Sequence, residues 1–273
     1  MGYDIIVLGT GPAGLAAAVG ARGRNKSVLV IGNRWEDSPL AKAERVDNYL
    51  GMPGRTGMEL LREYYDHAAA MGVEFVTGRA ISLMAWNGFM VTVGSQFYEG
   101  KALILAPGVV RQAKYPGETE YLGRGVSYCA TCDGMLYRGK NVAVLGYTDT
   151  ARHEAEFLQG IGCSVTYFPN PKSCTISGGS HVEQIVCDGE RADVEGVFIL
   201  RPTMAPTDIF PGLAVENGYV AVDRKMATNL PGVFAAGDCT GGPLQVSKAT
   251  GEGLIAGQSA AAYAAMIARK EMK

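Results

Sequence analysis

The stretch Tyr3–Arg22, which reads YDIIVLGTGPAGLAAAVGAR, decides the fold of this chain. It begins with an apolar run typical of a buried strand and continues into a GxGxxG pattern with glycines at positions 9, 11 and 14. In such a turn Gly9 allows the tight bend, Gly11 lets a pyrophosphate approach the backbone, and Gly14 lets the helix pack closely on the strand. The positive end of the helix dipole then faces the phosphates. This stretch therefore predicts a strand–turn–helix unit that binds a dinucleotide.

The residues that follow complete the start of a βαβ unit but do not choose the dinucleotide. Pro12 suits the first turn of the helix, where its missing N–H is not needed. Residues 27–31 form a second strand pattern. NAD-binding turns usually have an acidic residue at the end of this strand, which holds the ribose. Here the strand ends in Gly32 and Asn33. The turn alone therefore leaves FAD and NAD open.

A Gly-Asp pair near the C-terminus favours FAD. Residues 229–238, NLPGVFAAGD, combine a turn, a short apolar strand and the pair Gly237–Asp238. A helix pattern rich in small residues follows over 249–265. This arrangement resembles the way in which two-dinucleotide flavoproteins close over the ribityl chain and pyrophosphate of FAD. We therefore expect FAD in the first site.

A CxxC pair predicts a redox centre in the middle of the chain. Residues 125–134 read GVSYCATCDG, which places Cys129 and Cys132 one helical turn apart, within reach of a disulfide. At a helix N-terminus the dipole lowers the pKa of a thiol and favours the reactive thiolate. Asp133 follows directly and is placed to exchange a proton with the dithiol.

The alternative for the CxxC pair is half of a structural zinc site, which needs two further ligands at suitable spacing. The scattered cysteines at 163, 174 and 187 and the three histidines show no such pair, so a redox dithiol is favoured. Four clustered thiolates for an iron–sulfur cluster are also absent from the sequence. We expect Cys163, Cys174 and Cys187 to be packing or surface residues and Cys239 to be a core residue near the cofactor.

Composition excludes several classes of function. The chain has 273 residues and a formal net charge of -2, so no basic excess points to nucleic acid or anionic lipid. No apolar stretch reaches the roughly 18 residues that a membrane span needs. The chain starts directly in a strand pattern, without the regions of a signal peptide. We therefore expect a cytoplasmic protein that binds neither membranes nor nucleic acids.

The glycine turn at 9–14, the CATCDG segment at 129–134 and the GVFAAGD segment at 232–238 occur in the order and spacing of the low-molecular-weight thioredoxin reductases, which this chain resembles over nearly its whole length. Residues 65–78, 101–108 and 116–118 also have counterparts there. The resemblance implies a homodimer with the α/β fold of a flavoprotein with two dinucleotide-binding domains. Residues 1–111 and 225–273 would form a discontinuous FAD domain. Residues 112–224 would form an inserted, shortened domain that bears the CxxC pair, with crossovers near 108–114 and 222–228.

The same resemblance implies roles for individual residues. Cys132 would face the flavin, Cys129 would exchange with the disulfide of thioredoxin, and Asp133 would act as the acid–base group. Pro107 departs from the family, which usually has threonine there. The residues expected to contact FAD are Gly9, Gly11, Pro12, Ala13, Gly14, Gly32, Asn33, Asn48, Ala106, Gly108, Gly237, Asp238, Gln245 and Val246.

The middle domain lacks the features of an NADPH site. Residues 142–157, VAVLGYTDTARHEAEF, have the layout of a second nucleotide turn beginning at Gly146, but Thr148 stands where the next glycine is expected and only Ala151 fits the third position. A threonine side chain there occupies the space where pyrophosphate meets backbone. Residues 165–174 also lack the arginines with which the family grips the 2′-phosphate. Residues 140–200 leave room for one βα unit and a few short strands. We therefore predict that NADPH is not bound.

A retained CxxC pair beside a dismantled coenzyme turn resembles the ferredoxin-dependent flavin thioredoxin reductases. The resemblance implies electron transfer from reduced ferredoxin through FAD to the disulfide and then to thioredoxin, since flavin joins one-electron and two-electron carriers. An NAD(P)H-dependent reductase with an atypical site, a flavin-dependent dithiol oxidase and a non-catalytic flavoprotein with a sensor dithiol remain alternatives. An acidic ferredoxin would dock on a basic patch, and the candidates are Arg22, Arg24 and Lys26, or Arg111, Lys114, Arg138 and Lys140.

Overall fold

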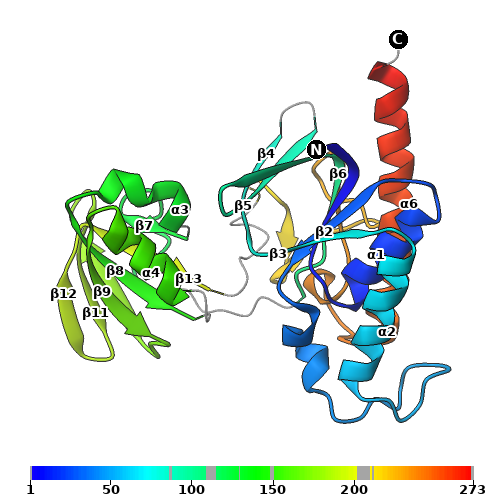
Figure 1. Cartoon of the computed structure of the whole chain (residues 1–273), viewed down its shortest axis with the longest axis horizontal. Coiled ribbons are helices and arrows are strands. Elements are labelled where there is room, and N and C mark those ends of the chain that lie inside the picture. The colour runs from blue at the N-terminus through cyan, green and yellow to red at the C-terminus, as the bar shows by residue number, and fades with distance from the viewer. Residues whose placement is uncertain are drawn as a thin grey trace. The chain divides into compact units, whose positions relative to one another are not determined.

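The computed structural model describes residues 2–85, 88–108, 115–128, 130–147, 151–201, 210 and 212–271, without the side chains of 81–85, 131–132 and 270–271. The chain forms two compact units (Figure 1). The first unit combines Met1–Val110 with Thr203–Lys273, and the second is Arg111–Pro202. Of the described helices, none has the length and apolar character needed to cross a membrane.

The first unit is built on a seven-stranded sheet in the order β3-β2-β1-β6-β5-β4, with β16 paired to β6. Strands β1, β2, β3, β6 and β16 are parallel, and the β4–β5–β6 pairings are antiparallel. The strands are β1 (Gly2–Leu8), β2 (Val28–Gly32), β3 (Glu74–Thr77), β4 (Ala80–Ala85), β5 (Phe89–Val93), β6 (Gln96–Leu105) and β16 (Val233–Ala235).

Both faces of this sheet are covered, which explains why its central strands are continuously apolar. Ile5 and Val7 of β1 pack toward the helices, and Ile6 and Leu8 pack on the opposite face. The covering helices are α1 (Pro12–Arg22), α2 (Gly57–Ala70) and α6 (Val246–Glu271), and shorter elements are η1 (Trp35–Asp37), η2 (Pro39–Lys42), η4 (Asp238–Thr240), β14 (Val215–Glu216) and β15 (Tyr219–Val220).

The small residues of α1 and α6 let these helices lie side by side (Figure 1). A Cβ added to Gly253 would lie 2.3 Å from the carbonyl oxygen of Ala13, and one added to Gly257 would lie 2.2 Å from that of Ala17. The two backbones therefore touch directly. This close packing fixes the first turn of α6 beside the glycine turn that begins α1.

The second unit contains a parallel sheet in the order β7-β13-β8-β9 and an antiparallel sheet in the order β10-β11-β12. The helices α3 and α4 pack against each other. The elements are β7 (Val126–Ser127), α3 (Ala130–Asp133), η3 (Gly134–Tyr137), β8 (Asn141–Gly146), α4 (Ala151–Gly160), β9 (Ser164–Pro169), β10 (Cys174–Gly178), β11 (Val182–Cys187), β12 (Glu190–Asp193) and β13 (Gly196–Leu200).

One expectation about the cysteines was wrong. Cys174 and Cys187 form a disulfide, with an S–S distance of 2.11 Å, between β10 and β11. The antiparallel register sets these two residues directly opposite each other, and both are buried. Sequence spacing alone does not reveal this pairing, because it depends on the register in which β10 and β11 pair. Cys163 and Cys239 are free and buried, as expected for packing residues.

The second passage between the units lies at a different place from the one expected, whereas the first, after residue 110, falls within the expected range of 108–114. The sequence placed the second crossover near 222–228, whereas the compact units divide between residues 202 and 203. Leu213 and Val220 pack in the core of the first unit beside Ile6, with Val222 against that core. The apolar positions in this segment are too few to show from sequence which core they join.

Candidate active site

The glycine turn after β1 has the geometry that a dinucleotide site needs. Gly9 has a φ of 126°, and a Cβ there would lie 2.1 Å from the carbonyl oxygen of Ala106. A Cβ on Gly14 would lie 2.0 Å from the carbonyl oxygen of Gly9. Only glycine fits at these two positions, whereas the nearest described atom to a Cβ on Gly11 is Ser38 Oγ at 3.9 Å. The backbone at Gly11 is therefore open to a ligand.

Other predicted contacts lie at the same edge of the sheet, because the carboxyl ends of β1, β2, β6 and β16 all lie there. A Cβ added to Gly32 would lie 3.3 Å from the Gly9 Cα. The Asn33 carbonyl accepts a hydrogen bond of 2.8 Å from Thr10 Oγ1. Asn48 and Gln245 are exposed and Val246 begins α6. Pro12 and Ala13 open α1, and Ala106 and Gly108 follow β6.

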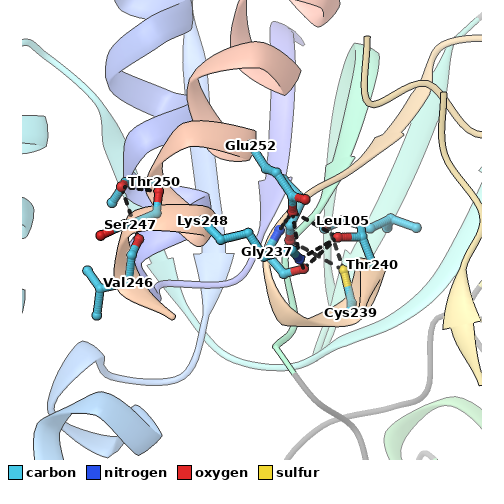
Figure 2. A network of polar contacts seen from close by, with 10 residues as sticks. Leu105, Gly237, Cys239, Thr240, Val246, Ser247, Lys248, Thr250 and Glu252 are labelled. Carbon is cyan, nitrogen blue, oxygen red and sulfur yellow. Dashed lines mark hydrogen bonds and ion pairs between the residues drawn. The ribbon is translucent and has the colours of Figure 1, made fainter. Parts of the chain in front are cut away.

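A partly buried polar network supports the Gly-Asp turn (Figure 2). Lys248 Nζ donates to the Gly237 carbonyl at 2.8 Å and lies 3.0 Å from Glu252 Oε2. Glu252 accepts the Gly237 amide hydrogen at 2.9 Å. Thr240 Oγ1 donates to the same glutamate at 2.8 Å. Two charged side chains of α6 therefore fix both backbone groups of Gly237, which has a φ of 85°.

The network also sets the electrostatics at Asp238. Burial raises the pKa of the Asp238 carboxyl, Lys248 opposes this shift, and Glu252 adds to it. Burial raises the pKa of the neighbouring Cys239 thiol to about 12, so this thiol stays protonated. Sequence reasoning did not identify Lys248 and Glu252 as site residues. Their spacing of four on a helix, just after the predicted flavin contacts Gln245 and Val246, was the available signal.

These features fit FAD. The turn at 9–14 offers open backbone and a helix N-terminus for a pyrophosphate. The turn at 237–238 is held rigid beside it, since a Cβ added to Gly237 would lie 2.7 Å from the Ala13 Cβ. Both turns and the start of α6 thus lie at one edge of the sheet, where the open backbone at Gly11 is available to a pyrophosphate.

The CxxC segment is described in part. Cys129 lies outside the described residues, and Cys132 is placed by its backbone in α3. Asp133 is partly buried, and its Oδ2 accepts a hydrogen bond of 2.7 Å from the buried Ser127 Oγ. A Cβ on Gly134 would lie 2.8 Å from Leu158 Cδ2. Glycine at this position therefore lets the CxxC turn pack on α4.

Aromatic side chains lie around the end of β8, where the second nucleotide turn begins. A Cβ on Gly146, at the end of β8, would lie 2.2 Å from Tyr167 Oη. Tyr147 Oη hydrogen bonds with Tyr115 Oη and donates to the Pro171 carbonyl at 3.3 Å. The Arg152 guanidinium lies 5.6 Å from the centroid of the Tyr167 ring. Thr148 lies outside the described residues. Glycine at 146 thus accommodates a tyrosine of the same unit.

The predicted basic residues have different surroundings. Arg22 is hydrogen bonded within the first unit: its guanidinium donates to the carbonyls of Met71 and Lys26 at 2.7 and 2.9 Å. Arg24 is exposed and donates to Gln258. Arg138 and Lys140 are exposed, and they follow the exposed side chains of Met135 and Leu136. Arg111 and Lys114 lie outside the described residues.

Comparison with known proteins agrees with this geometry. Residues 3–174 and 169–253 match the model of the pyridine nucleotide-disulphide oxidoreductase family. Thioredoxin reductase of Bacillus subtilis is 32% identical over 298 residues, which cover 96% of this chain and 94% of that protein. A structure of a ferredoxin-flavin thioredoxin reductase from Clostridium acetobutylicum is 35% identical, covers 100% of both chains and has a TM-score of 0.87. An atypical thioredoxin reductase from Desulfovibrio vulgaris Hildenborough is 30% identical, with a TM-score of 0.71 over 96% of this chain and 98% of that one.

These findings confirm the predicted fold class, a two-domain α/β flavoprotein with a discontinuous first domain and an inserted second one. They also agree with the fit of the first turn to FAD. The chain belongs to the pyridine nucleotide-disulphide oxidoreductase family and is an FAD-dependent disulfide oxidoreductase of the thioredoxin reductase type.

Proposed function

We propose that this enzyme takes electrons from reduced ferredoxin, without NADPH, and passes them through FAD and the Cys129–Cys132 disulfide to thioredoxin. The proposal extends to a cytoplasmic homodimer, the assembly that the family resemblance implies. The observation that carries it is the cluster of tyrosines at the end of β8, where a second nucleotide turn would begin. The similarity to a ferredoxin-flavin thioredoxin reductase over the whole chain supports the same donor.

These tyrosines argue against a coenzyme because of what a dinucleotide needs at the end of such a strand. A pyrophosphate must approach open backbone at the end of the first strand, beside the N-terminus of the following helix. In this unit that strand is β8, and Tyr147 follows it directly. The Tyr147 and Tyr115 hydroxyls lie within hydrogen-bonding distance of each other, and both lie close to the Pro171 carbonyl just beyond β9, at 3.3 and 3.0 Å. A nucleotide would have to break these bonds and displace both rings.

In the first unit, we assign FAD binding to residues at one edge of the sheet. The open backbone at 9–14 would hold the pyrophosphate, and the turn at 237–238 would hold the ribityl chain. Asn48, Gln245 and Val246 would contact the remaining parts of the cofactor. FAD, when bound, supplies a group that accepts electrons singly and delivers them as pairs.

In the second unit, we assign thiol exchange to the CxxC pair. The Cys129 thiolate attacks the thioredoxin disulfide, forms a mixed disulfide and releases the other thioredoxin sulfur as a thiolate. The Cys132 thiolate then attacks the Cys129 sulfur, which restores the Cys129–Cys132 disulfide and releases the second thioredoxin thiolate. The substrate gains two electrons and the CxxC pair loses two. Asp133, held by Ser127 at 2.7 Å, is placed to give or take the proton.

Thioredoxin would dock beside this pair. Met135 and Leu136 directly follow the CxxC turn, and their exposed fractions are 59% and 70%. Two apolar side chains that project this far into solvent are suited to an apolar surface on a partner. Arg138 and Lys140 continue the same exposed segment and supply positive charge. We place the partner contact on these four residues.

Reconstitution tests the proposal. Ferredoxin would be reduced anaerobically with hydrogen and hydrogenase, and thioredoxin thiols would be counted after addition of the enzyme. We expect thiols to form only when ferredoxin, enzyme and oxidised thioredoxin are all present, and NADPH or NADH to replace ferredoxin poorly. Efficient turnover with NADPH in the absence of ferredoxin would contradict the proposal. The matched control is Cys129→Ser, which should form no thiols.

A further inference from the structure

A buried carboxylate in the second unit has no part in the chemistry assigned so far. Glu118 is 0% exposed. Its carboxylate accepts hydrogen bonds from both terminal nitrogens of Arg201, the second at 2.8 Å. It also accepts from the Tyr128 hydroxyl at 2.9 Å and from the Tyr115 amide at 2.9 Å. Four donors therefore converge on its two oxygens.

This arrangement keeps Glu118 ionised inside the protein. Burial raises the pKa of its carboxyl, but the hydrogen bonds from Arg201, the Tyr115 amide and Tyr128 outweigh that effect and hold the pKa below its ordinary value. A buried ion pair is worth keeping only where its geometry is good and its remaining hydrogen-bonding positions are satisfied. The four donors meet that condition. The carboxylate is thus a rigid fixed point.

The groups on this carboxylate come from three separate parts of the chain. Tyr115 and Glu118 lie just after the first passage between the units, and Arg201 lies just before the second. Tyr128 directly precedes Cys129 in the sequence. One buried side chain therefore connects both ends of the unit to the segment that enters the CxxC pair.

The same cluster contains two of the rings at the end of β8. The Arg201 guanidinium lies 5.4 Å from the centroid of the Tyr115 ring and 6.0 Å from that of Tyr147. Burial, followed by the hydrogen bond with Tyr115, raises the pKa of the Tyr147 hydroxyl, so it stays neutral. Side chains at the position of a coenzyme turn thus support the CxxC segment through Arg201 and Glu118.

A second contact holds the other side of the CxxC segment. Ser127, in β7, donates to Asp133 at 2.7 Å. Strand β7 itself pairs with β13, the strand that ends one residue before Arg201. The CxxC segment therefore follows directly after Tyr128, whose hydroxyl is bonded to Glu118, and Asp133 at its other end is hydrogen bonded to Ser127 of β7.

We propose that Glu118 is a positioning residue for the redox-active CxxC pair and acts through the hydroxyl of Tyr128. This inference depends on one part of the proposed function, namely that Cys129 and Cys132 form the redox-active disulfide. Its consequence is that thiol reactivity depends on a buried carboxylate that, within the described part of the chain, accepts hydrogen bonds from Arg201, Tyr128 and the Tyr115 amide.

The test is Tyr128→Phe, which removes one hydroxyl and leaves the Glu118–Arg201 pair intact. Tyr121→Phe is the matched control, because Tyr121 is 4% exposed in the same unit and its hydroxyl donates to the Gly178 carbonyl at 2.6 Å. Each variant would be reduced with dithiothreitol and alkylated with iodoacetamide across a pH series. Peptide mass spectrometry would follow Cys129 separately, and thioredoxin reduction would give kcat and KM.

For Tyr128→Phe we expect the pH midpoint of Cys129 alkylation to move by about half a unit or more. We expect kcat to fall about 10- to 100-fold, since misplacement by about 1 Å costs on the order of 100-fold. KM for thioredoxin should change less than about twofold, because the docking residues are untouched. Tyr121→Phe should lower the melting temperature similarly while leaving the alkylation profile and kcat unchanged.

The inference is overturned if Tyr128→Phe lowers the melting temperature alone, with an unchanged alkylation profile and kcat. Failure of the proposed function looks different. If the Cys129→Ser variant still reduces thioredoxin, the redox-active disulfide is not Cys129–Cys132, and both the proposed function and this inference fail. An inactive Cys129→Ser together with an unaffected Tyr128→Phe would overturn the positioning role alone.

Discussion

Removal of the Cys174–Cys187 disulfide should loosen the hairpin that it closes without affecting flavin binding. The two cysteines are 13 residues apart, and closing a loop of that length restricts the unfolded chain by about 3 kcal/mol. The double variant Cys174→Ala/Cys187→Ala should therefore lose about 3 kcal/mol in the free energy of opening of β10 and β11. Since the disulfide lies in the second unit, the first unit should be unchanged.

Hydrogen exchange of peptides from residues 174–187 measures this effect. A loss of about 3 kcal/mol corresponds to exchange roughly 150-fold faster in these peptides when local opening limits exchange. Cys163→Ala is the control, because Cys163 is a buried free thiol in the same unit. Non-reducing digestion should also yield a cross-linked peptide that contains both cysteines. Two free thiols at 174 and 187, or an unchanged exchange rate in the double variant, would refute this reasoning.

Three further predictions concern other parts of the site. Glu118→Gln removes the buried carboxylate that pairs with the Arg201 guanidinium and should lower the free energy of unfolding by about 3 to 5 kcal/mol at pH 7. The folded pKa of Glu118 is lowered, so its stabilising effect is present above the unfolded pKa of about 4.3 and disappears as the pH falls through the folded value. In acid denaturation the stabilities of wild type and variant should therefore converge, and a constant difference down to pH 2 would contradict this. Gly11→Ala should fold normally and bind FAD more weakly, whereas Gly9→Ala, whose Cβ would lie 2.1 Å from a backbone oxygen, should lose the folded turn. Circular dichroism would measure folding and flavin titration would measure FAD binding, and equal behaviour of the two variants would argue against an open backbone at Gly11. Leu136→Asp should raise KM for thioredoxin at least about tenfold with little change in flavin reduction, because it places a charge in a proposed apolar contact; an unchanged KM in steady-state assays would move the docking surface elsewhere.

The glycine turn and the Gly-Asp turn of the first unit could be predicted from sequence because the features that define them are local. The glycines at 9 and 14 must be glycine for reasons that operate within one turn and its neighbouring strand. The pair Gly237–Asp238 likewise follows a short strand directly. In such places spacing along the chain determines spacing in the structure, so motif and geometry agree.

The features that sequence reasoning missed depend on residues far apart in the chain. Glu118 and Arg201 are 83 residues apart, and the family segment 116–118 that contains Glu118 does not indicate Arg201 as its partner. The pairing of Cys174 with Cys187 depends on the register of a hairpin. Sequence reasoning noticed the absent second glycine of the NADPH turn, but it did not show that tyrosines lie around the end of β8. That arrangement requires Tyr115, Tyr147 and Tyr167 to converge from three segments.

An anaerobic titration of the flavin tests the central claim most directly. NADPH, NADH and hydrogenase-reduced ferredoxin would be added separately to the purified enzyme, and absorbance at the oxidised flavin maximum would be followed. The account predicts that ferredoxin bleaches this band within seconds and that neither nicotinamide does. Prompt bleaching by NADPH or NADH would show that a coenzyme reaches the flavin despite the tyrosines at the second turn, and it would contradict the account.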